Sequence, residues 1–276
     1  MSISDQLITQ RRAEPAKMRD EMRQVLTEKE QQTLGINMGA GSDHPRAWVG
    51  PPFIYDLLGA MQFQLLIDLG MRENHKFLDV GCGSLRVGRL AINYLLENRY
   101  FGLEPNVDIL NRGCEMHFGA DIEKSQVIAK KKATFAHNTD FDFSLTGGPV
   151  DFVFAQSIAS HTGPAMTVKL LKAIADVSHD DTVSMVTYIR CGMPSKSNTE
   201  EGWFYPECVT YTDQAFGAFA RQAGLHAYRT VWPATNIRED GLVTTQHPTI
   251  LTKRPWKPRL NQRMTASLFE GIQKIN

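Results

Sequence analysis

The chain has 276 residues, 42% hydrophobic and 22% charged, with a formal net charge of zero; it can build a large core and has no overall field that attracts nucleic acid or acidic membranes. The first twelve residues do not resemble a signal peptide, no apolar run approaches the roughly 18 residues of a membrane span, and the four cysteines lack metal-ligand spacing. We therefore expect a cytoplasmic protein with reduced thiols that binds no metal, nucleic acid or membrane.

The amino-terminal part, residues 1–52, is predicted to form a helical cap or lid. Residues 4–34 are polar and helix-prone, and Pro15 is expected to divide them into two helical pieces. A stretch rich in glycine and proline follows, and apolar residues at helical spacing then predict a helix over 53–69. The cap either covers the protein's own active site or pairs with a second copy in a homodimer.

The middle of the chain alternates strands with helices, which favours a parallel sheet covered on both faces. The predicted strands are residues 76–80, 99–104, 133–137, 150–156 and 182–189, and the predicted helices are 84–96, 106–118 and 165–177.

The pattern changes after the fifth strand. An irregular, aromatic-rich insertion at 191–211 is followed by a helix at 213–223 and by two strands, 226–232 and 247–252. No helix is predicted between these two strands, so they are expected to be antiparallel. The remaining residues, 254–276, form a basic tail that is either a solvated extension or an oligomer contact.

A glycine turn follows the first predicted strand, in the run Leu78-Asp79-Val80-Gly81-Cys82-Gly83. Such a turn lets the polar end of a ligand approach bare backbone N–H groups. Glu104 ends the second strand 21 positions after Gly83, about the separation at which a nucleotide site places its ribose-binding carboxylate. Arg86 occupies the position of the third glycine of a dinucleotide site, which argues against NAD or flavin and suits a cofactor with a carboxylate and no pyrophosphate.

With these features the chain resembles the class I S-adenosylmethionine-dependent methyltransferases. The resemblance covers residues 53–253 and rests on four runs in order: 78–83, 102–105, 138–141 and 151–157. The chain also resembles bacterial methyltransferase-domain proteins that carry Gly-Ser-Leu-Arg after the first motif, here residues 83–86. The resemblance implies an α/β fold with a Rossmann-like seven-stranded sheet, mostly parallel with an antiparallel last strand. It also implies S-adenosylmethionine as cofactor and S-adenosylhomocysteine as product.

The resemblance assigns the turn after the first strand to the methionine part of the cofactor. Gly81, Cys82 and Gly83 would lie against it. Asp79 would orient the loop or the cofactor ammonium, or else cap a helix. Arg86 would pair with the cofactor carboxylate, or else be solvated on the first helical turn.

The resemblance assigns the nucleoside part of the cofactor to the next strand ends. Glu104 would accept bonds from both ribose hydroxyls, unless it is an ordinary surface acid. Asp140 would accept from the adenine amino group with Phe141 near the ring, and Asp142 is a close rival. Gln156 would contact the cofactor or the substrate.

The loop after the fourth strand carries the candidate catalytic residues, Ser157 and His161. An imidazole titrates near neutrality and can take a proton from a hydroxyl or amine as the methyl arrives. His161 could instead be a capping or loop histidine. Methyl transfer from a sulfonium also has no obligatory base, because alignment and desolvation can supply much of the acceleration.

Four aromatic residues are candidates for the substrate side: Trp48, Tyr55, Trp203 and Tyr205. They would build a lid that excludes water and favours the sulfonium by cation–π contact, or they would pack the amino-terminal segment onto the core.

The sequence therefore predicts a methyltransferase that acts on a hydroxyl or amine of a small molecule or glycan. The alternatives are another transferase, a lyase or a cyclase in the same cofactor pocket, and a non-catalytic binding module, because fold does not fix chemistry.

Overall fold

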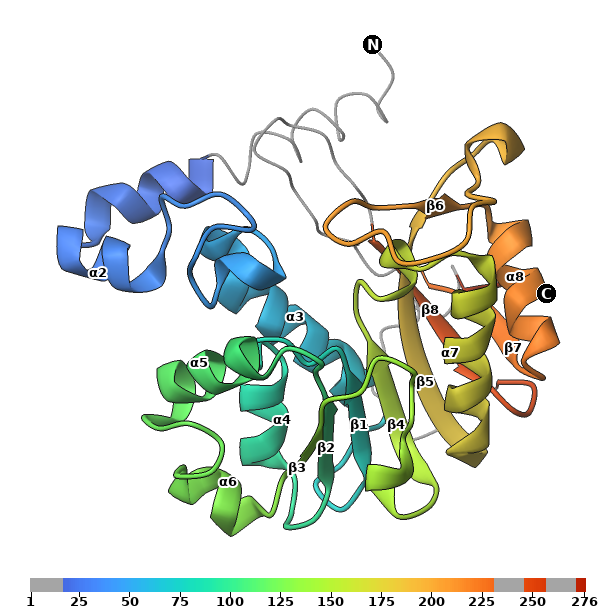
Figure 1. Cartoon of the computed structure of the whole chain (residues 1–276), viewed down its shortest axis with the longest axis horizontal. Coiled ribbons are helices and arrows are strands. Elements are labelled where there is room, and N and C mark those ends of the chain that lie inside the picture. The colour runs from blue at the N-terminus through green and yellow to red at the C-terminus, as the bar shows by residue number, and fades with distance from the viewer. Residues whose placement is uncertain (1–16, 231–245, 257–271) are drawn as a thin grey trace.

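The computed structural model describes residues 17–230, 246–256 and 272–276, whose strands form one sheet in the order β3-β2-β1-β4-β5-β8-β7-β9, with β6 paired to β5 (Figure 1). The strands are β1 (Phe77–Val80), β2 (Tyr100–Leu103), β3 (Thr134–Ala136), β4 (Val150–Ala155), β5 (Ser178–Arg190), β6 (Thr210–Tyr211), β7 (His226–Arg229), β8 (Gln246–Thr252) and β9 (Gln273–Lys274).

The first five strands run parallel, and β8 lies antiparallel between β5 and β7. This confirms the predicted α/β fold with a mostly parallel sheet and an antiparallel closing pair. The prediction of seven strands is wrong, because the described residues contain nine. The two additional strands, β6 and β9, have only two residues each, too few to leave a hydrophobic period in the sequence.

Helices lie beside both halves of the sheet, with α4 and α5 near β1 and β2 and with α7 and α8 near β5 and β7 (Figure 1). The α-helices are α2 (Glu28–Leu34), α3 (Tyr55–Asp68), α4 (Gly88–Tyr94), α5 (Val107–Phe118), α6 (Gln126–Lys131), α7 (Pro164–Asp176) and α8 (Asp213–Gln222). The 3₁₀ helices are η1 (Ala47–Val49), η2 (Pro52–Ile54), η3 (Ser144–Thr146), η4 (Ala159–His161) and η5 (Pro194–Lys196).

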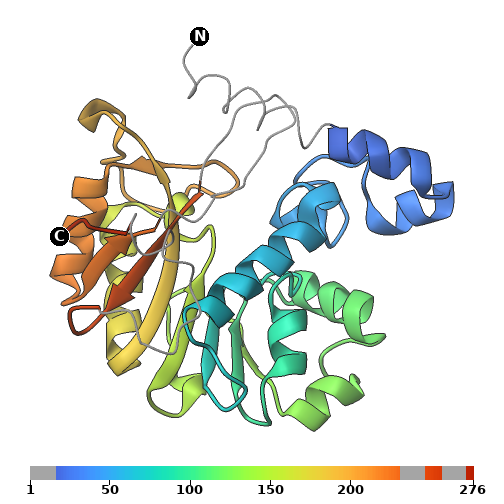
Figure 2. The ribbon, with the colours of Figure 1, turned by 180° about the vertical axis from the view of Figure 1, so that it is seen from behind.

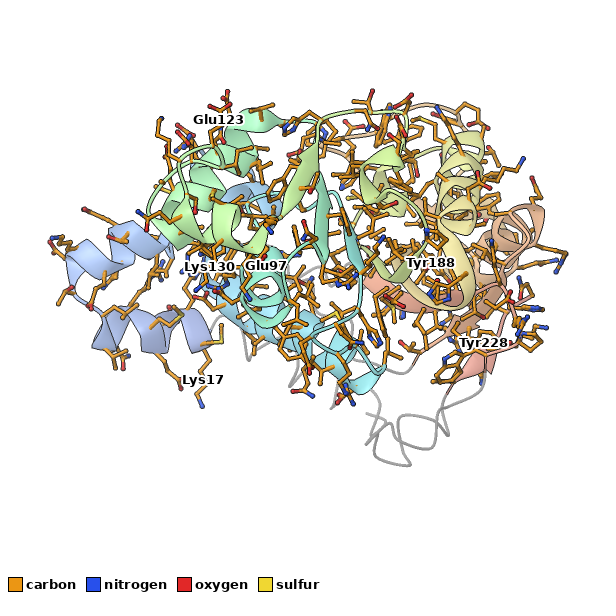
Figure 3. All side chains as sticks on the ribbon, turned by 90° about the horizontal axis from the view of Figure 1, so that it is seen from below. Lys17, Glu97, Glu123, Lys130, Tyr188 and Tyr228 are labelled. Carbon is orange, nitrogen blue, oxygen red and sulfur yellow. The ribbon has the colours of Figure 1, made fainter. Side chains whose placement is uncertain are left out.

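Alternate residues of β1 belong to two separate cores. Phe77 packs in the core that includes residues of α3, α4 and α5, and Leu78 packs in the core that includes residues of α7 and α8. Both side chains are fully buried. Because helices cover both faces, the central strands β1 and β2 are buried at every position and mostly apolar instead of alternating, as expected of a buried parallel sheet, with Asp79 as the charged exception. In Figure 3, Tyr188 of β5 and Tyr228 of β7 lie in the right half of the molecule, and Glu97 and Lys130 lie left of its centre.

The helix expected from residue 84 begins four residues later, at Gly88. Leu85 has a φ of 62°, a left-handed conformation that an α-helix cannot include, and its side chain is fully buried. Residues 81–87 therefore form a longer turn than the sequence suggests.

The cap is helical, as expected, in residues 17–25 and in α2, and α3 runs from it to the sheet (Figure 2). The two pieces separate at Thr27, whose hydroxyl caps α2 by accepting from the N–H of Glu30. The break expected at Pro15 lies outside the described residues. No helix among the described residues is long and apolar enough to cross a membrane.

The described end of the tail is part of the sheet. β9 pairs with β7, and Ile275 donates its backbone N–H to the carbonyl of Ala227. For residues 272–276 the expectation of a solvated extension is therefore wrong. Residues 257–271 lie outside the described residues.

Candidate active site

The turn after β1 is held against the carboxyl end of β2. Gly81 and Gly83 have φ of 68° and 53°, a region that favours glycine. The N–H groups of Gly81 and Cys82 donate to the carbonyl of Leu103, at 2.8 and 3.0 Å. The N–H of Gly83 donates to Oε2 of Glu104 at 3.0 Å. The glycine turn and the acid at the end of β2 are therefore one hydrogen-bonded unit.

Two side chains that the sequence did not single out lie directly on this turn. A Cβ placed on Gly81 would overlap Cδ1 of Ile158, and one on Gly83 would lie 2.5 Å from Cγ1 of Val49. Ile158 comes from the loop after β4 and Val49 from η1 of the cap. Neither has a sequence signal, since each is an isolated apolar residue in an irregular segment.

Glu104 has both carboxylate oxygens fixed by backbone donors. Besides Gly83 on Oε2, the N–H of Asn106 donates to Oε1 at 2.9 Å. Burial raises the pKa of Glu104, and the two N–H groups act against that rise. Glu104 is therefore held in place by the backbone, and its role toward a ribose stays a prediction.

Asp79 lies below the turn, not in it. Its side chain is almost completely buried, and the hydroxyl of Tyr100 donates to Oδ2 at 2.8 Å. Burial raises the pKa of Asp79 to about 7, against that hydrogen bond and the charge of Arg86. The side chain of Cys82 is also buried, and its backbone N–H donates to the carbonyl of Leu103.

Arg86 ties the cap to the turn. Its Nε donates to Oε1 of Gln62 in α3 at 3.2 Å, and its NH1 donates to the carbonyl of Val49 at 2.5 Å. Only 9% of the residue is exposed, so the alternative of a solvated cation is wrong. Burial lowers the pKa of this guanidinium.

The loop after β3 separates the two rival acids. Asp142 accepts from the N–H of Ser144, the first residue of η3, at 2.8 Å, and this hydrogen bond lowers the pKa of Asp142. Asp140 is exposed and, among the described residues, has no such bond. Phe141 is buried, with a φ of 63°. Asp142 is therefore tied to the loop backbone through one oxygen and Asp140 is not, and the choice between them as the adenine acceptor stays a prediction.

The loop after β4 brings Ser157 and His161 together, with Oγ of Ser157 3.5 Å from Nε2 of His161. The other ring nitrogen, Nδ1, donates to the carbonyl of Glu207 at 2.5 Å. Nε2 is then the unprotonated nitrogen. Burial lowers the pKa of His161, so the neutral form prevails at pH 7. Gln156 is half-buried just before this pair.

The insertion at 191–211 runs alongside η4. Phe204 donates its N–H to the carbonyl of His161, Val209 donates to Ser160, and Trp203 forms a bridge with Thr162. These bonds hold the segment that carries two exposed aromatic side chains, Trp203 at 47% and Tyr205 at 63% exposure. The ring of Tyr205 lies edge-on to that of His161, with ring centroids 5.3 Å apart. The ring centroids of Trp203 and Phe141 are 5.8 Å apart.

Tyr55 does not lie with these aromatic residues. It is 1% exposed, and its hydroxyl donates to the carbonyl of Ser84 at 2.9 Å and lies 2.8 Å from Nε2 of His117. Arg46 and Arg89 lie over its ring, at 5.0 and 5.4 Å. Tyr55 thus packs the cap onto α4 and α5, the second of the two roles considered for the aromatic residues.

Trp48 also contacts α5, because the guanidinium of Arg112 lies 4.4 Å from its ring centroid. Trp48 precedes Val49, however, and so stays next to the glycine turn. Among the described residues, no group of three His, Cys, Asp or Glu side chains is arranged to hold a metal ion. An open groove of about 650 Å³ between α7 and α8 contains none of the predicted site residues.

The chain matches no protein-family model and no curated protein. Among solved structures, magnesium protoporphyrin IX methyltransferase (ChlM) from Synechocystis PCC 6803 with bound SAH aligns with a TM-score of 0.51 at 11% identity, over 86% of this chain and 100% of that one. A S-adenosylmethionine-dependent methyltransferase from Clostridium acetobutylicum ATCC 824 aligns with a TM-score of 0.50 at 9% identity, over 72% and 91%. The fold is that of the S-adenosylmethionine-dependent methyltransferases. The [4+2]-cyclase SpnF also aligns, with a TM-score of 0.50 at 13% identity, over 70% of this chain and 66% of that one.

Within this fold, most of the predicted residues meet at one edge of the sheet. The strands β3, β2, β1 and β4 are neighbours and parallel, so their carboxyl ends lie together. These ends carry Asp140 and Phe141, Glu104, the glycine turn, and the segment from Gln156 to His161. Open parallel sheets bind their ligands at this edge.

Proposed function

We propose that the chain is an S-adenosylmethionine-dependent methyltransferase that acts on a hydroxyl or amine of a small molecule or glycan. One observation carries the proposal: the N–H of Gly83 is bonded to the carboxylate of Glu104, which joins the glycine turn and the acid at adjacent strand ends. The ChlM structures with bound SAH and SAM support it, because proteins of this fold hold that cofactor.

The residues present fit this cofactor. A Cβ at Gly81 or Gly83 would meet Ile158 or Val49, so the turn requires glycine at both positions, and Glu104 keeps lone pairs for two ribose hydroxyls after accepting two N–H bonds. Asp140 is available to an adenine amino group beside Phe141. Arg86, buried beside the turn, supplies a positive charge that complements a carboxylate, and Asp79 below it complements an ammonium.

His161 is the proposed general base. When bound, S-adenosylmethionine supplies a methyl group on a sulfonium, whose carbon–sulfur bonding pair stays on sulfur as the acceptor's lone pair takes the methyl. Nε2 of His161 would receive the acceptor's proton, because Nδ1 is already committed to the carbonyl of Glu207. Trp203 and Tyr205 would cover the acceptor and exclude water.

The proposal is tested with S-adenosylmethionine labelled in the methyl group. The protein is incubated with separate sets of phenols, alcohols, amines and sugars, and the products are separated and counted. Label in one acceptor class, lost in His161→Gln, supports methyl transfer with a general base. Label that persists in His161→Gln supports transfer by alignment alone.

A cyclase is the second candidate, because SpnF has this fold and is named as a [4+2]-cyclase. A cyclase would bind the cofactor without passing its methyl group to any product. Binding without label transfer across all four acceptor sets would therefore favour this candidate.

A further inference from the structure

A buried polar cluster lies behind the proposed base, formed by Thr187 of β5, Gln246 of β8, and the serines 157 and 160 of the loop after β4. Gln246 is 3% exposed. Its Nε2 lies 2.8 Å from Oγ of Ser157 and 2.9 Å from Oγ of Ser160, and its Oε1 lies 2.8 Å from Oγ1 of Thr187. The cluster joins the antiparallel strand β8 to the loop that carries His161.

The hydrogen bonds in this cluster have one consistent direction. Oγ1 of Thr187 accepts from the N–H of Ser157 at 2.8 Å, so its own hydrogen is free to point at Oε1 of Gln246. The amide of Gln246 then turns its two N–H groups to the two serines. With the amide reversed, the hydroxyl hydrogen of Thr187 would have no acceptor in the cluster, and this would cost about 1–3 kcal/mol at a buried group.

Gln246 therefore controls where the hydrogen of Ser157 points. Oγ of Ser157 accepts from Gln246, so its hydrogen is directed to another acceptor, and Nε2 of His161 lies 3.5 Å away. Ser160 receives the second N–H of Gln246 and can in turn donate to Ser157, 3.1 Å away. When Ser160 donates in this way, both lone pairs of Ser157 are taken, and Ser157 is then a donor to Nε2 and a poor acceptor from it.

We infer that Gln246 is a positioning residue that keeps Ser157 turned as a donor toward Nε2 of His161 and so holds that ring in its proton-accepting form. The catalytic meaning of this inference rests on the proposed function. At 3.5 Å the contact from Ser157 is weak, so an acceptor hydroxyl can take its place. If Nε2 were protonated, Ser157 could not accept its N–H until the hydroxyl group of Ser157 rotated.

Few other groups face His161 among the described residues. The thiol of Cys208 lies 4.0 Å from Nδ1, the ring of Tyr205 contacts the imidazole edge-on, and Glu207 contributes its main-chain carbonyl. None of these carries a charge beside Nε2. A change in the titration of His161 after a change at Gln246 therefore reports on the serine between them.

The test follows His161 by nitrogen NMR of the full chain with ¹⁵N in its histidine rings. The chain has eight histidines, and the signals of His161 are identified as those that are missing from the spectrum of His161→Gln. In wild type at pH 7 we expect Nε2 of His161 to be unprotonated and Nδ1 to be protonated. A proton on Nε2 would overturn the inference without any further variant.

The decisive variant is Gln246→Met, which keeps the length of the side chain and removes both donors. Ser157 can then accept from a protonated Nε2, so the titration midpoint of His161 should rise by roughly one unit. Gln246→Glu should raise the midpoint further, because a carboxylate only accepts and adds a negative charge. The matched control is Thr249→Val on the same strand, whose buried hydroxyl has no hydrogen-bond partner among the described residues. It should leave the midpoint unchanged.

An unchanged midpoint in a folded Gln246→Met protein would overturn the inference. Should that variant fail to fold, Ser157→Ala removes the donor itself and should also raise the midpoint, and no rise there would have the same consequence. Calorimetric binding of S-adenosylmethionine is measured separately. Binding with no shift at His161 contradicts the role of Gln246 alone, and a shift without binding contradicts the proposed function alone.

Discussion

Replacing Glu104 with glutamine tests the nucleoside half of the proposed site at one atom. The wild-type carboxylate accepts from Gly83 and Asn106 and keeps lone pairs for two ribose hydroxyls. A glutamine has one accepting oxygen and one amide group that only donates. Its amide would face one of the two backbone N–H groups, and one ribose hydroxyl would lose its acceptor.

The size of the effect follows from these bonds. A hydrogen bond to a charged group contributes about 1.5–3 kcal/mol, so Glu104→Gln should weaken S-adenosylmethionine binding roughly 10- to 150-fold. The clash of the amide with a backbone N–H should also cost about 1–3 kcal/mol of folding stability. In a chain of this size each kcal/mol lowers the melting temperature by about 2–4 °C.

Calorimetry measures the affinity, and a thermal melt of each variant shows whether it is folded at the titration temperature. The matched control is Glu97→Gln, whose side chain is 53% exposed, pairs with Lys132 and lies beside Lys130 in Figure 3. The control should bind as wild type does. Affinity within twofold of wild type in a folded Glu104→Gln protein would refute the assignment of this carboxylate to the cofactor.

Three further predictions concern the turn, the buried acid below it and the base. Gly83→Val should abolish cofactor binding because its side chain meets Val49, whereas Gly147→Val, at a φ of 60° with open space around it, should suffer backbone strain alone; equal affinities in the two proteins would count against the turn. The pKa of Asp79 is raised to about 7 by burial, so its contribution to the free energy of unfolding is greatest at low pH and is lost as the pH rises from about 4 to 7. Asp79→Asn should therefore flatten the pH dependence of urea unfolding over that interval, and an unaltered curve would show that Asp79 is already ionised there. His161→Gln should lower turnover about 10²- to 10⁴-fold and leave cofactor affinity within twofold, and an equal loss of affinity would make the residue a cofactor contact instead.

The order of strands and helices could be predicted because the central sheet is buried on both faces. Its strands β1 and β2 are short, mostly apolar runs, and each is followed by a glycine or a polar residue, β1 by Gly81 and β2 by Glu104. The antiparallel closing pair was predictable from the missing crossover helix. The two-residue strands β6 and β9 were not, because their pairing depends on partners far along the chain.

The site was predictable only where a strand end fixes a residue's place. Burial of Arg86 depends on Gln62 in α3 and Val49 in the cap, and nothing in the sequence indicates that these two residues contact it. The aromatic side chain of Tyr55 would suit a lid, but contacts with α4 and α5 bury it. Gln246 is one polar residue at the start of a strand, and only the pairing of β5 with β8 brings it to the serines.

The most direct test of the central claim is a calorimetric titration of the purified protein with S-adenosylmethionine and S-adenosylhomocysteine, with NAD as the control. The account predicts micromolar binding of the first two and none of NAD, because the turn has no third glycine for a pyrophosphate and Glu104 is placed for a ribose. Absence of binding by both sulfur compounds, in a protein that melts cooperatively, would contradict the account and favour a non-catalytic module of the same fold.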